Sequence, residues 1–470
     1  MVFSSLFFVL VFLPIVFSLY YIAEKTKSML LKNTVVLVAS LFFYAWGGLN
    51  NFILLIVLII LNYCLSLLMQ TKLRTLFFLL CVAMNIMVLI YYKYLNFIFE
   101  NSYIFINDFL GIQIENKQVH VDLPIGISFF TFQIISYIVD VYRKSVPIQR
   151  NIFKLGLYVM MFPQLIAGPI VRYIDINNMI NERTTSHSDA ESGIRRFIIG
   201  LAKKVFIANT MGSIADVVFA MDPTTTNFIY LWLGALCYTL QIFFDFSAYS
   251  DMAIGLGKVF GFTYKENFNY PYVATSIQDF WRRWHISLSS WFRDYVYIPL
   301  GGSRCSKSRT IFNCMVVFAL TGIWHGAEWH YMLWGCFHGA FLILERLGLS
   351  KLLAIIPKYL QHLYALIIVV IGWVLFRADT AEQCFTFVRG MFTLSFDNIL
   401  DGGGANVLPR ITYFVVFFFV VGWILSFSSL SVVRLKIKDW FRDFLIIALF
   451  LLTVIYLSGV SYNPFIYFKF

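Results

Sequence analysis

Three histidines stand close together in an otherwise apolar run, TGIWHGAEWHYMLWGCFHG at 321–339. An imidazole has an unperturbed pKa of about 6.5, so at neutral pH it can act as a general acid or base. We expect His325 to be such a base, because Gly322 and Gly326 flank it and would leave backbone and space open for a ligand. For His330 and His338 we expect the commoner role of a core residue that donates a hydrogen bond to a carbonyl.

A polar segment precedes this run, at 249–309, and it is too polar to cross a membrane. Its aromatic and basic residues alternate in a way that predicts an amphipathic helix in the headgroup layer, with rings in the acyl boundary and cations toward phosphate. These residues are Trp281, Arg282, Arg283, Trp284, His285, Trp291 and Arg293. The cations, with Arg304, could equally bind the phosphates of a substrate or contact lipid headgroups.

Metal and dinucleotide chemistry are disfavoured by spacing. A zinc site on a helix uses two histidines at i and i+3 or i+4, whereas His325, His330 and His338 do not have this spacing. The seven cysteines form no CxxC pair, so we expect neither a disulfide framework nor a zinc site. Gly255, Gly257 and Gly261 match a dinucleotide fingerprint only loosely and more simply permit close helix packing.

The elements that must position these residues are membrane helices. Hydrophobic residues make up 60% of the 470 positions and charged residues only 13%, against about half and about a quarter in soluble domains. The mean hydropathy is +0.77. The net charge of +11 does not indicate nucleic-acid binding, because the cations lie in short loops between apolar runs, as expected for cytoplasmic loops.

Runs of the length needed to cross hydrocarbon, about 17 to 25 residues, recur along the chain. The clear ones fall near 1–22, 52–69, 76–92, 125–142, 228–246, 331–347, 411–429 and 443–458. Less regular ones near 34–45, 152–170, 196–220, 311–324 and 363–376 are interrupted by Gly, Pro or charge, which predicts kinked or re-entrant pieces. We therefore expect an all-α polytopic bundle of roughly a dozen helices in one domain, 1–470, with the first run retained as a transmembrane helix.

Lysine and arginine orient these runs, since they are enriched in short cytoplasmic loops. Lys25, Lys27 and Lys32 follow the run at 1–22, and Lys72 and Arg74 follow the run at 52–69. The segment 94–124 between later runs is net acidic. This alternation, with the basic stretch 434–442 before the last run, predicts that both termini lie outside.

Several long motifs resemble the membrane-bound O-acyltransferase family, in the branch of the alginate O-acetyltransferase membrane subunit and its peptidoglycan-acetylating relatives. The motifs are LPIGISFFTFQIISYIVDVYR at 123–143, FPQLIAGPIVRY at 162–173, GLAKK at 200–204, FFDFSAYSDMAIGLGKVFGF at 243–262, ENFNYPY at 266–272, DFWRRWHISLSSWFRDYVYIPLGGSR at 279–304 and TGIWHGA at 321–327. The resemblance is dense over 120–345.

The resemblance implies a bundle around a pore-like centre, with His325 as the essential histidine and His285 on the cytoplasmic approach. It implies acetyl-coenzyme A as donor substrate, with no permanently bound cofactor, and it leaves Arg282, Arg283 and Arg293 as candidates for donor binding. The acceptor would be an envelope polysaccharide, an alginate-like exopolysaccharide before peptidoglycan, reached through an outward-facing esterase-like partner at the bacterial inner membrane.

The final residues, NPFIYFKF, resemble a short aromatic tyrosine motif in which the tyrosine is thought to carry the acyl group. Tyr467 would then be a nucleophile on a tail placed outside by the charge pattern. The simpler alternative is an interfacial aromatic anchor. For the whole chain, the alternative function is a transporter or flippase of an acylated lipid or glycan, which would release no coenzyme A.

Overall fold

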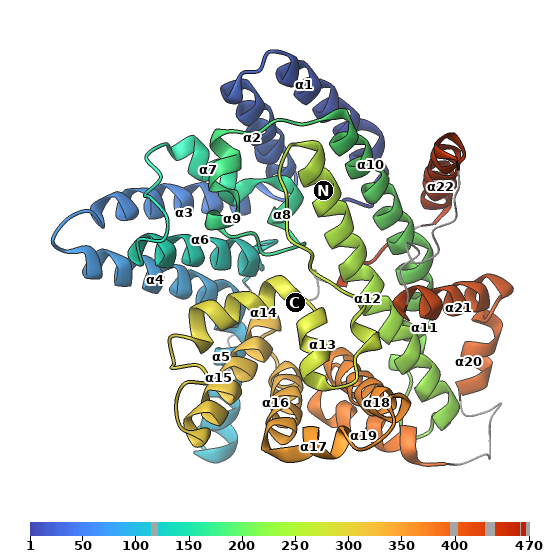
Figure 1. Ribbon diagram of the computed structural model, residues 1–470. Coiled ribbons are helices and arrows are strands. Elements are labelled where there is room, and N and C mark those ends of the chain that lie inside the picture. The colour runs from blue at the N-terminus through green and yellow to red at the C-terminus, as the bar shows by residue number, and fades with distance from the viewer. Residues whose placement is uncertain (114–120, 395–402, 428–437, 461, 467–470) are drawn as a thin grey trace. The chain divides into compact units, whose positions relative to one another are not determined.

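The computed structural model describes residues 1–113, 121–394, 403–427, 438–460 and 462–466 (Figure 1). Within these ranges the regular secondary structure is helical and no strand occurs, which confirms the all-α prediction. The chain forms two compact units. The first comprises Met1, Phe7–Glu191 and Leu256–Tyr264, and the second comprises Val2–Leu6, Ser192–Gly255 and Lys265–Phe470. The expectation of a single domain over 1–470 stays a prediction.

The first unit is built from short helical hairpins. Its helices are α1 Leu13–Lys25, α2 Met29–Ala45, α3 Leu49–Leu68, α4 Arg74–Leu89, α5 Leu95–Ile104, α6 Ile127–Tyr142, α7 Ile152–Met160, α8 Phe162–Leu165 and α9 Tyr173–Asn181. The α3–α4 hairpin lies against α6 (Figure 1). The interruption expected within 152–170 is confirmed, because α7 ends at Met160 just before Pro163, whose ring cannot continue a helix.

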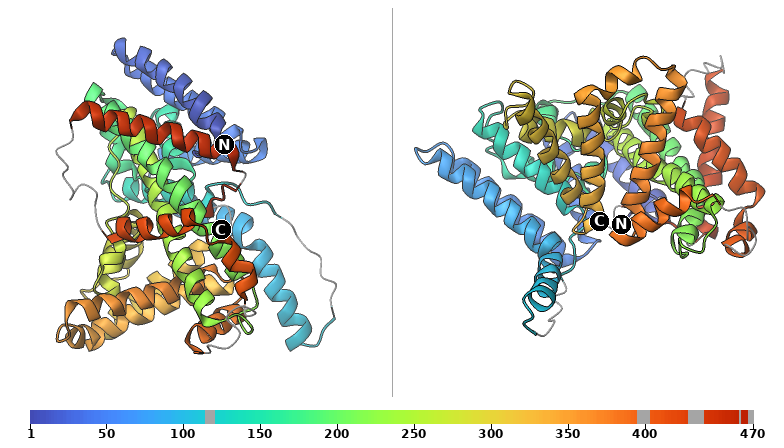
Figure 2. Two further views of the ribbon diagram at one scale, coloured as in Figure 1. Left: turned by 90° about the vertical axis from the view of Figure 1, so that its right-hand side faces the viewer. Right: turned by 90° about the horizontal axis from the view of Figure 1, so that it is seen from below.

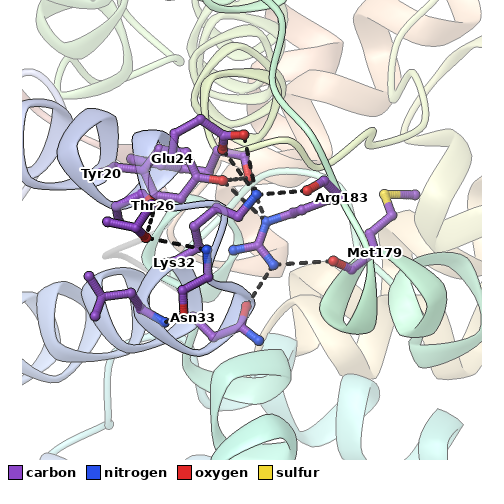
Figure 3. Close-up of polar contacts among 11 residues, drawn as sticks. Tyr20, Glu24, Thr26, Lys32, Asn33, Met179 and Arg183 are labelled. Carbon is purple, nitrogen blue, oxygen red and sulfur yellow. Dashed lines mark hydrogen bonds and ion pairs between the residues drawn. The ribbon is translucent and has the colours of Figure 1, made fainter.

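Two buried cations tie distant parts of the first unit together (Figure 3). Lys32 pairs with Glu24 at 3.2 Å and donates to the carbonyl of Arg183 at 2.8 Å. The Arg183 guanidinium in turn donates to Asn33 Oδ1 and to the Phe260 carbonyl. Cations this deep need several partners because each loses its hydration, and here the partners come from four separate stretches of chain.

The second unit holds the longer helices. They are α10 His187–Ala202, which begins in the first unit, α11 Asn209–Phe219, α12 Phe228–Val259, α13 Ile277–Arg283, α14 Ile286–Phe292, α15 Lys307–His325, α16 Trp329–Leu344, α17 Ser350–Leu353, α18 Lys358–Arg377, α19 Ala381–Phe392, α20 Ala405–Val407, α21 Tyr413–Phe427 and α22 Asp439–Gly459. The last turn of α12 belongs to the first unit. A π-helical segment, Lys203–Ala208, joins α10 to α11.

Eight helices in the described parts of the chain are long and apolar enough to cross a membrane. They are Phe8–Lys25, Leu49–Leu68, Arg74–Phe109, His187–Phe219, Phe228–Val259, Trp329–Leu353, Lys358–Arg377 and Asp439–Gly459. Two runs predicted as full spans are shorter, since α6 has 16 residues and α21 has 15.

Part of the predicted segment 94–124 is helical instead of looped. The helix that begins at Arg74 continues through two π-helical segments to Phe109. The physical reason is that residues 95–109 remain rich in aromatic and aliphatic side chains despite a few polar ones, so the apolar surface continues.

The outer faces of these helices are apolar, as a lipid environment requires. Along α22 (red in Figures 1 and 2) the side chains of Leu445, Ile447, Leu452 and Ile455 are all exposed. A contiguous exposed apolar surface of this kind would be unstable in water. The chain is therefore a multi-pass membrane protein.

Candidate active site

A tightly packed helical hairpin positions His325. Helices α15 and α16 lie side by side (Figures 1 and 2), and glycines allow their backbones to touch. A Cβ on Gly322 would come within 2.4 Å of the Tyr331 carbonyl oxygen, and one on Gly335 within 2.4 Å of the Phe318 carbonyl oxygen. His325 is the last residue of α15, so this packing fixes its backbone.

The expectation that Gly322 and Gly326 leave open space beside His325 is wrong. The space beside Gly322 is occupied by the α16 backbone, and a Cβ on Gly326 would overlap the ring of Tyr331. The glycines are needed for close helix approach. Gly255 serves the same purpose, as expected from the sequence, because a Cβ there would come within 2.5 Å of the Gly193 carbonyl oxygen.

Aromatic rings surround the His325 imidazole. Its ring centroid lies 4.9 Å from that of Trp324 and 5.0 Å from those of Trp334 and Phe376. His325 is 5% exposed, so the ring sits in an apolar enclosure of fixed geometry. Such an enclosure excludes water and holds the imidazole in one orientation.

His285 occupies the break between α13 and α14. Its φ is +42°, which is rare for a residue with a Cβ and marks a backbone held in place by its surroundings. Asn267 supplies that support, since its carbonyl oxygen accepts from Ile286 N–H and its Oδ1 accepts from the Ser287 hydroxyl at 2.8 Å. His285 Nδ1 lies 3.4 Å from the same hydroxyl oxygen.

Burial keeps the His285 ring neutral. Loss of hydration lowers the pKa of His285 to about 3, so the ring does not titrate near neutral pH. The ring of Trp324 is a neighbour of both histidines, with its centroid 6.1 Å from that of His285 and 4.9 Å from that of His325. The structure thus brings both sequence-predicted histidines to one indole ring.

The tryptophans of this segment do not face the acyl boundary, as the sequence led us to expect. Trp281, Trp284 and Trp291 are buried within the second unit, at 8%, 3% and 4% exposure. The prediction of one amphipathic helix fails because the segment is two seven-residue helices with a break at His285. Trp281 and Trp284 pack into the apolar core of the second unit.

The three candidate arginines differ in placement. Arg282 is exposed, and Arg283 pairs with Asp279 at 3.0 Å. Arg293 lines a cavity of about 280 Å³, which we call the arginine cavity, together with Arg346 and the buried Glu345. Glu345 accepts from the backbone N–H groups of Ile277 and Gln278, so it caps the start of α13. The sequence analysis missed Arg346, because its neighbourhood forms only on folding.

The other two histidines of the run are also buried. His338 is fully buried among rings including Trp281 and Trp334, and neither ring nitrogen has a hydrogen-bond partner in the described part of the chain. The carbonyl expected to accept from it is therefore not found. His330 instead pairs through Nδ1 with Glu328 at 3.1 Å.

A second cavity, of about 300 Å³, lies beside the last described residues, and we call it the tail cavity. It is lined by Asp216, Tyr238, Gln241, Glu328, His330, Tyr331, Phe376, Arg377, Ala378, Asp379 and Pro464, Phe465 and Ile466. Phe376 also contacts His325. Tyr467 lies outside the described residues, but Phe465 and Ile466 just before it are buried, at 4% and 6% exposure.

Sequence reasoning missed the charged residues near Pro464, Phe465 and Ile466. Lys204 pairs with Asp245 at 2.6 Å, and Arg377 pairs with Asp216 at 2.8 Å. The available signal was an ionisable residue within an apolar helix, which by default indicates function. Lys204 and Asp245 stand inside two of the quoted motifs, GLAKK and FFDFSAYSDM.

Comparison with known proteins relates this arrangement to one family. Residues 143–376 match the family model of the membrane-bound O-acyltransferases. The chain is 42% identical over 414 residues to a probable alginate O-acetylase of Pseudomonas aeruginosa, covering 87% of this chain and 78% of the relative. It is 39% identical to the Pseudomonas putida counterpart over the full length of both. A peptidoglycan O-acetyltransferase of Helicobacter pylori is 35% identical, over 84% of this chain and 80% of the relative.

Proposed function

The chain belongs to the membrane-bound O-acyltransferase family, and from that premise we propose that it takes an acetyl group from cytoplasmic acetyl-coenzyme A and passes it across the bacterial inner membrane to an envelope polysaccharide. That the protein is an O-acyltransferase follows from the family. The donor, the path and the acceptor are the proposal.

One observation carries the proposal, namely that the last described residues enter the second unit near the buried histidine. Pro464, Phe465 and Ile466 line the tail cavity, and Phe376 in its wall contacts His325. Ile466, the residue that precedes Tyr467 in the sequence, is buried. This supports Tyr467 as an acyl carrier over an interfacial aromatic anchor.

The first transfer can be written with these groups. His325 takes the proton of the Tyr467 hydroxyl while the phenolic oxygen attacks the thioester carbonyl carbon, forming a C–O bond. The C–S bond then breaks, and the leaving sulfur of coenzyme A takes the proton from the histidine. The products are an acetyl ester on Tyr467 and free coenzyme A.

His285 has a different role from His325. Its pKa of about 3 makes it a weak base, but a neutral imidazole can hydrogen-bond a bound donor without titrating. We assign it to donor positioning. With the charge-derived topology, the arginine segment lies at the cytoplasmic face, and Arg293 with Arg346 in the arginine cavity would bind donor phosphates.

The second transfer moves the acetyl group from Tyr467 to a polysaccharide hydroxyl, through the outward-facing esterase-like partner. The relatives' names favour an alginate-like exopolysaccharide first and peptidoglycan second. Both termini would lie on the outer side, so coenzyme A never has to cross the membrane.

The proposal is tested by coenzyme A release from labelled acetyl-coenzyme A with purified protein in lipid. The wild type should release free coenzyme A, and His325→Ala should lose about 100- to 10,000-fold in rate while inserting normally, since general-base catalysis contributes that much. A His325→Ala variant with wild-type turnover would remove His325 from the mechanism.

Tyr467→Phe tests the carrier separately, because it deletes one hydroxyl and keeps the aromatic ring. We expect polysaccharide acetylation in cells to be lost. Near-normal acetylation in Tyr467→Phe cells would leave only the anchor role for this residue.

A further inference from the structure

Residues 462–466, which we call the tail segment, are held by polar groups of the second unit at several points. Ile466 N–H donates to Asp245 Oδ2 at 2.9 Å. The Lys204 ammonium donates to the Pro464 carbonyl oxygen and pairs with Asp245 Oδ1 at 2.6 Å. One buried ion pair therefore binds a backbone donor and a backbone acceptor two residues apart.

Further contacts fix the same segment on both sides of this pair. The Tyr462 hydroxyl donates to Asp216 Oδ2 at 2.5 Å, and Arg377 pairs with the other oxygen of that carboxylate. Asn463 donates to the Ser4 carbonyl oxygen. Phe465 stacks on Tyr249 with ring centroids 4.6 Å apart. Each residue from 462 to 466 thus has a defined partner, and the register is set.

Core stability alone does not account for the Lys204–Asp245 pair. Lys204 is 3% exposed and Asp245 is 1% exposed in their side chains. Burying such a pair costs desolvation energy that a pair of well-packed apolar residues would avoid. What apolar residues cannot supply is a hydrogen-bond donor for the Pro464 carbonyl and an acceptor for Ile466 N–H, which would then be buried without partners.

Local structure separates Lys204 from its neighbour. Lys203 and Lys204 begin the π-helical segment Lys203–Ala208, and such segments often occur at functional sites. Lys203 points to Asp251 at 3.0 Å, where the two side chains are 29% and 18% exposed. Only Lys204 reaches the tail segment, so the pair of adjacent lysines offers a matched control.

We propose that Lys204 and Asp245 are positioning residues that clamp the backbone of the tail segment and thereby set where the residue after Ile466 is presented for acyl transfer. The proposal rests on the carrier role of Tyr467 for its functional consequence. The clamp itself is independent of that role, because it binds backbone atoms of residues 464 and 466.

The test removes both charges together, since removing one would leave the other buried and unpaired. In Lys204→Met/Asp245→Leu we expect a melting temperature near that of the wild type. Hydrogen–deuterium exchange of the peptide that ends the chain should become at least tenfold faster, because Ile466 N–H loses its acceptor. Polysaccharide acetylation in cells should fall at least tenfold. Lys203→Met should change neither the exchange rate of this peptide nor polysaccharide acetylation.

A second variant tests the clamp from the tail side in case the double variant does not fold. Ile466→Pro removes the N–H that Asp245 binds and leaves the ion pair in place, whereas Ile466→Val keeps that N–H. We expect faster exchange and lost acetylation for Ile466→Pro and wild-type behaviour for Ile466→Val.

The outcomes distinguish the clamp from the carrier. Unchanged exchange in a folded double variant, or unchanged exchange in Ile466→Pro, overturns the clamp. If Tyr467→Phe acetylates normally while the double variant shows fast exchange, the carrier role fails and the clamp on the backbone stands.

Discussion

Two lysines in this protein have nearly the same surroundings and different consequences. Lys32 in the first unit and Lys204 in the second are buried, each pairs with a carboxylate, and each donates to a backbone carbonyl. The carbonyl that accepts from Lys32 belongs to Arg183, whose own side chain is hydrogen-bonded within the first unit (Figure 3). The carbonyl that accepts from Lys204 belongs to Pro464, which lies near the end of the described chain and lines the tail cavity.

The difference shows what a buried charge can be used for. The Lys32 cluster joins several segments of the first unit through their side chains and backbone carbonyls, so it stabilises the fold. The Lys204 pair holds the tail segment, which lines the tail cavity together with Phe376, a neighbour of His325. The same chemistry therefore supports architecture in one unit and, on our proposal, positioning for reaction in the other.

The largest expected effect is a loss of folding stability, and it distinguishes Lys32 from Lys204. Lys32→Met leaves Glu24 and the Arg183 carbonyl without their cation, and breaking a buried pair in this way costs about 3 to 5 kcal/mol. We expect a lower melting temperature and a smaller yield of folded protein. Coenzyme A release per folded molecule should stay at the wild-type level, and a specific loss of that rate would end the distinction between the two regions.

A smaller effect is expected at His285, where His285→Ala should reduce activity about tenfold, less than His325→Ala. Because burial lowers the pKa of His285 to about 3, its ring does not titrate between pH 5 and 8. The pH profile of the remaining activity should therefore keep the wild-type shape. An acidic limb that disappears in His285→Ala would show that this ring, and not His325, carries the titrating proton.

A weaker effect is expected from substitutions in the arginine cavity, and it should concern binding of the acetyl donor. Arg293→Gln should raise the apparent Michaelis constant for acetyl-coenzyme A several-fold and change turnover little, since the cation would bind donor phosphate and not the reacting carbonyl. Arg282→Gln is the comparison, because Arg282 does not line the cavity. Equal losses in Michaelis constant and turnover for Arg293→Gln would indicate a structural role.

The smallest effect is expected at His330, although it lines the tail cavity. His330→Ala removes a ring whose Nδ1 contacts the half-exposed Glu328, and we expect activity within about twofold of the wild type, because this contact joins no residue that we assign to the transfer. A loss that matched His325→Ala would make His330 part of the chemistry and would extend the reactive region into the cavity.

Sequence reasoning succeeded where a single local property was enough. Apolar runs predicted most helices. The roles of the two motif histidines stay predictions, and the structure adds that both contact one indole ring. It failed where the local structure depends on side chains and backbone that pack together from distant parts of the sequence. The periodicity of Trp281 and Trp284 could not reveal a break at His285, and Gly322 was interpreted as open space because its partner, the Tyr331 carbonyl, lies on another helix. Lys204 stood in a quoted motif, but its partners lie 41 and 260 positions away.

The clamp binds main-chain atoms, and this sets which sequence changes the protein can accumulate. A substitution at 464 or 466 that keeps the carbonyl and the N–H leaves both bonds intact, so side-chain identity there is free to drift within the limits of packing. A one-residue insertion or deletion before Tyr462 leaves the two clamp bonds available to the same residues, whereas one between Ile466 and Tyr467 would, on the carrier proposal, change the distance from the clamp to the carrier. Indels after the clamp should therefore be purged from natural variants far more strictly than replacements.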